Sequence, residues 1–130
     1  MSVKLTVVDQ AGTGMVINEL VFEVAEHLTA RELIRKRVFE EVTMINLSKT
    51  ERYNGLVQPA DEEVTLNGKR VPRRREINWE EQADTAVEAF EQNGFFILVD
   101  DKQIENLDDV IHIREDTRVE FVRLVQLVGG

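Results

Sequence analysis

The residues with the clearest chemical potential are the last two, Gly129 and Gly130, which carry a carboxylate on backbone without side chains. They follow an apolar run over residues 121–128 that is typical of a final strand running into a tail. Glycine permits close approach of the backbone to another surface because it has no Cβ. We therefore expect this carboxylate to be able to enter a narrow active site of another protein. The alternative is that the pair is incidental, since chain ends often fray.

The other candidate catalytic or metal-binding residues do not form an enzyme motif. His27 and His112 have no second His or carboxylate at ligand spacing, so we expect no metal site and no bound cofactor. The sequence has no Gly-rich phosphate loop and no Ser nucleophile motif, and the absence of Cys excludes disulfides and thiolate chemistry. Paired carboxylates are numerous because the chain is acidic, and we interpret them as solvated surface. The sequence predicts a protein that is not an enzyme.

A basic run stands out in this acidic chain. It contains five of the sixteen basic residues within seven positions, namely Lys69, Arg70, Arg73, Arg74 and Arg75. Such a run can dock an acidic partner or a phosphate-bearing ligand. The other interpretation, which we favour, is a solvated loop that pairs with nearby carboxylates.

Composition limits the class of protein. The 130 residues fit one domain, residues 1–130, with the 42% hydrophobic and 32% charged content of a folded soluble protein. No apolar stretch approaches a membrane span and the N-terminus lacks signal-peptide order, so we expect a cytoplasmic protein without membrane contact. The net charge of -9 argues against nucleic acid as a partner.

The first third predicts two strands and a helix. Residues 3–9 alternate with a period of two, and residues 16–24 form a second strand that pairs back as a hairpin. Thr29 with Glu32 is a capping box, which begins a helix. Its apolar face carries residues at helical spacing: Leu33, Ile34, Val38, Val42 and Ile45.

The middle third is weaker in pattern. We expect residues 46–72 to be loop with a small hairpin, whose arms 63–66 and 69–72 flank the turn Asn67-Gly68. Asn78 and Glu81 form a second capping signature, and the helix that follows ends at Asn93-Gly94. One face of this helix is predicted to be core rather than a partner groove: Trp79, Ala83, Ala86, Val87 and Phe90.

The last third predicts short strands over residues 95–99, 103–105 and 119–125, with a turn at Asp100-Asp101. A first hairpin, a helix across one face, and later strands returning to the sheet describe a two-layer α+β fold. The first and last strands are expected to lie parallel at the centre of a mixed sheet packed on the helix. That arrangement is the β-grasp.

The segment FILVDDKQIENLDDVIHIREDTRVEFVRLVQLVGG, residues 96–130, resembles the C-terminal half of ubiquitin. The order agrees: an apolar strand, a turn, Lys102-Gln103-Ile104-Glu105, a Leu107-Asp108-Asp109 segment, Ile111 to Ile113, an acidic turn, and a strand leading to Gly-Gly. Glu23-Val24 and Thr29 resemble the corresponding places in the first half. The match leaves residues 46–94 as an insertion with a hairpin and an extra helix, and residues 124–130 as a flexible tail. The expected fold is therefore a ubiquitin-like β-grasp.

The resemblance implies a protein modifier. An E1-like activating enzyme would adenylate Gly130 with ATP and capture it as a thioester, and an E2-like conjugating enzyme would pass it to a lysine amine of target proteins. A deconjugating protease is a further implied partner. Gly129 would be the slim neighbour that Gly130 needs. The activating enzyme would recognise the tail: Leu124, Val125, Gln126, Leu127 and Val128.

The tail departs from the ubiquitin pattern. Ubiquitin has two arginines there, and the nearest positions are Gln126 and Val128, which implies a different activating enzyme. We align the last strand on inward Val119 and Phe121, because the other register would bury Arg123 unpaired.

In the register that we prefer, Leu98 and Val122 match two positions of the apolar patch that partners of ubiquitin bind. Lys102 matches a lysine used for chain linkage. Leu98 is equally well interpreted as an ordinary half-buried strand residue.

Two other functions remain open from the sequence. Sulfur carriers share this fold and ending, and in them the adenylated glycine becomes a thiocarboxylate. The third possibility is a noncovalent interaction module in which the Gly-Gly ending plays no part.

Overall fold

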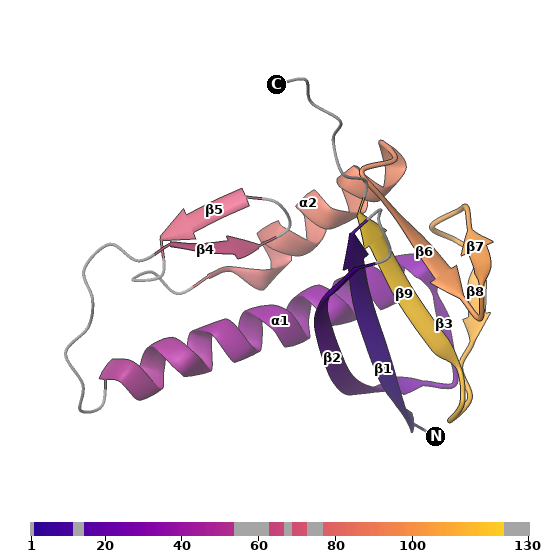
Figure 1. Cartoon of the computed structure of the whole chain (residues 1–130), viewed down its shortest axis with the longest axis horizontal. Coiled ribbons are helices and arrows are strands. Elements are labelled where there is room, and N and C mark those ends of the chain that lie inside the picture. The colour runs from indigo at the N-terminus through magenta and orange to yellow at the C-terminus, as the bar shows by residue number, and fades with distance from the viewer. Residues whose placement is uncertain (1, 12–14, 54–62, 67–68, 73–76, 124–130) are drawn as a thin grey trace.

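The computed structural model describes residues 2–11, 15–53, 63–66, 69–72 and 77–123, with side chains for 2–11, 15–47 and 77–123 (Figure 1). The elements in chain order are β1 (Ser2–Ala11), β2 (Val16–Ala25), β3 (His27–Thr29), α1 (Ala30–Tyr53), β4 (Glu63–Leu66), β5 (Lys69–Pro72), α2 (Trp79–Glu91), β6 (Phe95–Val99), β7 (Lys102–Ile104), β8 (Val110–His112) and β9 (Arg118–Arg123).

Five of the described strands form a mixed sheet in the order β2-β1-β9-β6-β7. β1 is antiparallel to β2 and parallel to β9, and β6 is antiparallel to both β9 and β7. The predicted parallel pairing of the first and last strands at the centre is confirmed. β3 pairs with β8, and β4 with β5, outside this sheet. The chain is therefore an α+β protein, and Figure 1 shows α1 crossing one face of the sheet.

The core lies between this face and α1. Leu5 and Val7 of β1 are fully buried, as are Leu33 and Ile34 of α1, which confirms the predicted strand and helix periods. Ile97, Val119 and Phe121 complete the inner face of the central strands. Val119 and Phe121 therefore point inward, in the register that we expected.

The start of α1 is capped as predicted. The backbone N–H of Thr29 donates to Glu32 Oε1 at 2.9 Å, and the N–H of Glu32 donates to Thr29 Oγ1 at 3.1 Å. The next two N–H groups, those of Ala30 and Arg31, donate to the carbonyls of Asp109 and Leu107, each at 3.0 Å. The loop before β8 thus satisfies first-turn donors that the helix itself leaves unpaired.

The prediction of loop after residue 45 was wrong for residues 46–53, because α1 continues to Tyr53. The polar stretch contains good helix formers and no Gly or Pro before Gly55, so nothing in its backbone preferences ends the helix earlier. The two arms of the predicted hairpin are confirmed as β4 and β5. Its turn, Asn67-Gly68, lies outside the described residues.

The second helix is confirmed. Asn78 is the N-cap, and its side chain accepts from the N–H groups of Glu80 and Glu81 at 3.0 and 3.2 Å. The helix ends at Glu91 with Gln92 as its C-cap, and Asn93 follows with a φ of 61°. Of the face predicted to be core, four residues are buried, namely Ala83, Ala86, Val87 and Phe90, while Trp79 is half-buried.

Candidate functional site

The predicted reactive tail would leave the sheet where β9 ends. Arg123, the last residue of β9, lies opposite Ala11 of β1 and Phe95 of β6. The predicted tail residues 124–130, with Gly129 and Gly130, lie outside the described residues. The neighbourhood of this strand end is therefore the part of the structure that bears on the proposed chemistry.

Leu98 and Val122 lie on the face of the sheet opposite the core. Leu98 is paired with Glu120, and Phe96 with Val122, so that Leu98 and Val122 are diagonal neighbours on one face. β1 extends this surface, because Val8 lies opposite Glu120 and Gln10 opposite Val122. The four apolar side chains, Val8, Phe96, Leu98 and Val122, are half-buried. We call them the outer apolar patch.

A buried carboxylate lies at the centre of this patch. Glu120 is only 6% exposed, although it belongs to the outer face. Its carboxylate accepts a hydrogen bond from Gln10 Nε2 and lies 3.2 Å from Arg118 Nε. These partners offset the cost of removing a charge from water. Sequence alternation gives the face of a side chain and not how closely its neighbours cover it, so the burial of Glu120 could not be read from the strand pattern.

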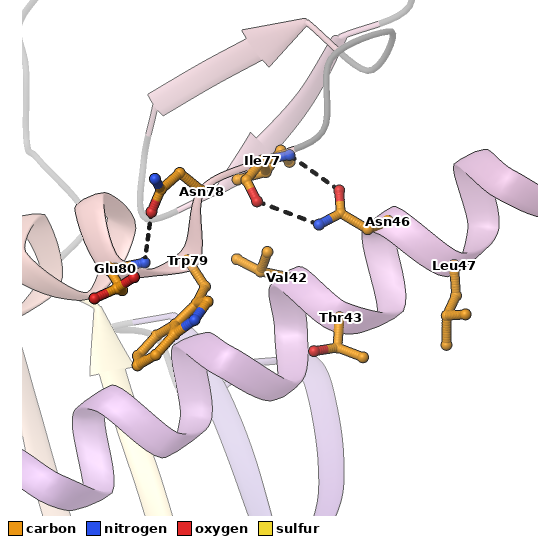
Figure 2. Close-up of a pocket in the computed structure, with 8 residues that line it drawn as sticks. All are labelled: Val42, Thr43, Asn46, Leu47, Ile77, Asn78, Trp79 and Glu80. Carbon is orange, nitrogen blue, oxygen red and sulfur yellow. Dashed lines mark hydrogen bonds between the residues drawn. The ribbon is translucent and has the colours of Figure 1, made fainter.

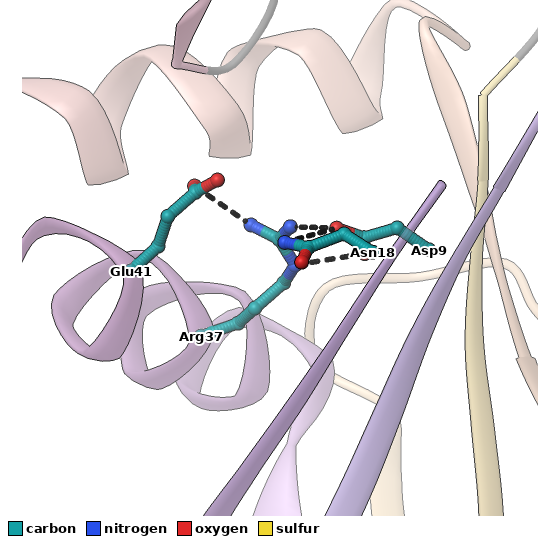
Figure 3. Close-up of polar contacts among 4 residues, drawn as sticks. All are labelled: Asp9, Asn18, Arg37 and Glu41. Atoms are coloured by element: carbon teal, nitrogen blue, oxygen red, sulfur yellow. Dashed lines mark hydrogen bonds and ion pairs between the residues drawn. The ribbon is translucent and has the colours of Figure 1, made fainter. Parts of the chain in front are cut away.

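A second polar cluster lies on the core side of the same end of the sheet (Figure 3). The guanidinium of Arg37, on α1, meets the carboxylate of Asp9, on β1, with its Nε donating to Oδ1 at 3.1 Å and its Nη2 donating to Oδ2. Arg37 Nη1 donates to Glu41 at 3.1 Å, and Asn18 of β2 donates to Asp9 at 3.5 Å. Arg37 and Asp9 are each 3% exposed.

The surroundings favour the charged form of Arg37. Burial lowers the pKa of Arg37, but the hydrogen bonds and charges of Asp9 and Glu41 outweigh it and raise that pKa above its ordinary value. The guanidinium also lies 5.3 Å from the ring centroid of Phe121, which stacks on Phe95 at 5.5 Å. This cluster therefore fixes α1, β1 and β9 to one another just before β9 ends. Sequence reasoning missed it, because helix and strand periods do not show which polar residues meet.

The remaining predicted site residues are distributed over the surface or lie beyond the described part. Lys102 is exposed at the start of β7, after a turn in which Asp100 and Asp101 have φ angles of 49° and 67°. Lys69 and Arg70 belong to β5, but their side chains are not among those described. Arg73, Arg74 and Arg75 lie outside the described residues. The docking role of the basic run stays a prediction.

A pocket of about 630 Å³ lies between α1 and the start of α2 (Figure 2). Asn46 spans one side of it, donating to the carbonyl of Ile77 at 3.2 Å and accepting from its N–H at 3.0 Å. Trp79 lines it and packs edge-on against Phe39 with ring centroids 5.2 Å apart. The pocket marks a place where α1 and the start of α2 are less closely packed.

No family model, curated protein or solved structure matches this chain. Among the side chains that the structure describes, no three or more His, Asp or Glu gather in a way that could hold a metal ion. No helix in the described ranges has the length and apolar character needed to cross a membrane.

Proposed function

We propose that this chain is a ubiquitin-like β-grasp modifier whose Gly130 carboxylate is activated by a partner enzyme and joined to lysine amines of target proteins. The observation that carries the proposal is the strand order β2-β1-β9-β6-β7, with parallel β1 and β9 at the centre and α1 across one face. This order brings the last strand to the middle of the sheet. The sequence after β9 continues for seven residues and ends in Gly129-Gly130.

The chemistry resides in the carboxylate and needs no catalytic residue of this chain. The carboxylate attacks the α-phosphate of ATP and pyrophosphate leaves, giving an acyl adenylate. A cysteine thiolate of the activating enzyme then displaces AMP, and transfer to a conjugating enzyme exchanges one thioester for another. A lysine amine finally displaces the thiolate and forms an isopeptide bond. The proposal requires a free carboxylate on Gly130, whether encoded or produced by proteolysis.

The outer apolar patch is the surface that we assign to recognition by partner enzymes. Its half-buried side chains provide area for contact, and the ion pair of Glu120 with Arg118 supplies a fixed polar feature within it. The patch includes the last positions of β9, so a partner docked on it would also be close to the root of the tail. Lys102 is exposed and so accessible as an acceptor for chain linkage.

The insertion and the tail are the parts that we assign to selectivity. Residues 46–94 carry the extension of α1, the β4–β5 hairpin and α2, which a minimal β-grasp does not need. Gln126 and Val128 replace two arginines of the ubiquitin tail, so we expect a dedicated activating enzyme. The site of action that we propose is the cytoplasm.

The decisive test is incubation of the chain with ATP and the activating enzyme from its own genome neighbourhood, followed by intact-mass and gel analysis. An ATP-dependent thioester that reductant removes, and then a lysine adduct, would support the modifier. Replacement of one oxygen by one sulfur would instead identify a sulfur carrier. Absence of any ATP-dependent product would contradict both covalent functions and leave the noncovalent module. Deletion of Gly130 is the control that must abolish either product.

The recognition surface has its own test. Replacing Leu98 or Val122 with Ser should reduce transfer from the activating to the conjugating enzyme, since apolar contact area is lost. Val21→Ser is a matched control, because Val21 is an exposed apolar residue of β2. Equal transfer rates for the patch variants and the control would contradict the assignment of this patch.

A further inference from the structure

The two histidines, which are far apart in the sequence, lie side by side in the structure. His27 of β3 lies directly opposite His112 of β8, and their ring centroids are 4.5 Å apart with the ring planes at 86°. The strand pairing thus closes the separation that argued against a metal site from the sequence. Both side chains are exposed, so rotation about χ2 can turn one nitrogen of each ring toward a common point.

The spacing of the rings fits one shared metal ion. Metal–nitrogen bonds of about 2.0 Å place an imidazole centroid about 3.2 Å from the ion. Two imidazoles with a nitrogen–metal–nitrogen angle of about 90° therefore have centroids about 4.5 Å apart. A tetrahedral nitrogen–metal–nitrogen angle would separate the two centroids by about 5.2 Å. Right-angle ligand pairs belong to tetragonal and octahedral ions such as Cu²⁺ and Ni²⁺, for which imidazole is a suitable ligand.

The surroundings leave room for the rest of the coordination sphere. The two rings line an open pocket of about 860 Å³, which also contains the charged residues Lys4, Glu26, Arg114 and Glu115. Two carboxylates balance two cations there, so no excess positive charge repels a divalent ion. The pocket volume allows water molecules to fill the positions that the two imidazoles leave open.

The backbone holds the two histidines in place. Leu28 and Ile111, their neighbours in β3 and β8, are buried and lie opposite each other. The N–H of Ile113 donates to the carbonyl of Glu26 at 2.7 Å, one step beyond the histidine pair. The pair therefore exists only in the folded chain.

We propose that His27 and His112 form a bidentate site for a divalent transition-metal ion with right-angle ligand geometry, Cu²⁺ or Ni²⁺. Water completes the coordination sphere, which leaves positions open for a further ligand. This proposal is independent of the modifier function, because it involves neither the tail nor the outer apolar patch.

The test is titration of the tag-free, full-length chain with NiCl₂ and CuCl₂ in neutral buffer, followed by calorimetry and by amide NMR. We expect one ion per chain, with Cu²⁺ bound more tightly than Ni²⁺. Paramagnetic broadening by Cu²⁺ should centre on the residues around positions 27 and 112. Ni²⁺ should raise the melting temperature, because it binds the folded state and the unfolded chain has no preformed site for it.

Variants decide whether the pair acts as a chelate. His27→Ala and His112→Ala should each weaken binding at least about tenfold, and the double variant should lose little more, because a single imidazole no longer chelates. Glu91→Gln and Glu105→Gln, which change exposed carboxylates outside this pocket, are the matched controls and should change the dissociation constant by less than about threefold. Amide spectra of the metal-free variants check their folding. Equal binding by the wild type and both single variants, or broadening centred on other acidic surfaces, would overturn the proposal.

Discussion

Helix α1 makes two attachments that use the same kinds of charge in different surroundings. Arg37 pairs with Asp9 of the sheet, and both side chains are 4% exposed. Two residues earlier, Arg35 pairs with Asp84 of α2 at 3.3 Å, with side chains that are 35% and 79% exposed. Water screens the second pair and leaves it worth little, whereas loss of one member of the first would strand a buried charge. We call the attachment of α1 to the sheet the first junction and its attachment to α2 the second. The two junctions differ in the burial of their ion pairs more than in the charges.

Apolar side chains support both attachments. α1 contributes Leu33, Ile34 and Val38 to the core, each at most 1% exposed, and α2 contributes Ala83 and Ala86, each at most 3% exposed. On the α2 side, Val42 and Ile77 line the pocket, and Asn46 supplies two polar contacts. Because the α2 side has this pocket and an exposed ion pair, we expect α2 to detach from α1 before α1 leaves the sheet.

The largest effect on stability is expected from Arg37→Ala at the first junction. It removes the partner of buried Asp9, and we expect a loss of about 3 to 5 kcal/mol in the free energy of unfolding, measured by urea denaturation. The double variant Asp9→Leu with Arg37→Met is the companion, and it should recover much of that loss because it leaves no unpaired charge at either position. A loss below about 1 kcal/mol for Arg37→Ala would show that the pair is no more important than a surface one.

At the second junction the largest effect is expected from Asn46→Ala. It leaves the N–H and carbonyl of Ile77 without this partner, and should lower stability by about 1 to 3 kcal/mol. Native-state hydrogen exchange should show faster exchange confined to α2. If hydrogen exchange became faster by the same factor in β1 and β9, the two junctions would open together, which would contradict the predicted difference in their stability.

The start of α1 tests the sheet side with a smaller change. Thr29→Ala removes the hydroxyl that accepts from the N–H of Glu32, and we expect a loss of about 1 kcal/mol by thermal or urea unfolding. Thr29→Ser keeps the hydroxyl and serves as the control. The prediction fails if the Ser variant loses as much as the Ala variant.

The smallest effect is predicted for Asp84→Ala. The ion pair with Arg35 is exposed, and Arg35 keeps its position over the Trp79 ring at 5.2 Å, so stability should change by no more than about 0.5 kcal/mol. The same measurement in high salt should remove even this difference. A loss comparable to that of Arg37→Ala would contradict the role that we assign to burial.

Much of the fold followed from local patterns. The alternation of β1, the capping box at Thr29 and the N-cap at Asn78 each depend on neighbours in the sequence, and all three are confirmed. The three-residue strands β3 and β8 were not predicted, since they are too short to show a period. The extension of α1 was missed because a polar helix face carries little pattern.

The candidate site was only partly predictable for a related reason. The resemblance to ubiquitin implied a shared patch for Leu98 and Val122, and the register between β6 and β9 places both on one face of the sheet. Contacts such as Arg37 with Asp9 or His27 with His112 depend on how distant elements meet, and polar side chains give no periodic signal of that meeting. The tail residues, on which the proposed chemistry depends, lie outside the described residues.

The parallel pair at the centre of the sheet also determines when the molecule can fold. Thr6 lies opposite Arg118, so the central contact joins segments from distant parts of the chain. Such long-range contacts make folding slow, because a large loop must close before the contacts form. During synthesis the β1–β2 hairpin emerges long before β9, with the inner edge of β1 unpaired and open to wrong partners. Of the described strands, β9 is the last to leave the ribosome, and it is the one that completes the core.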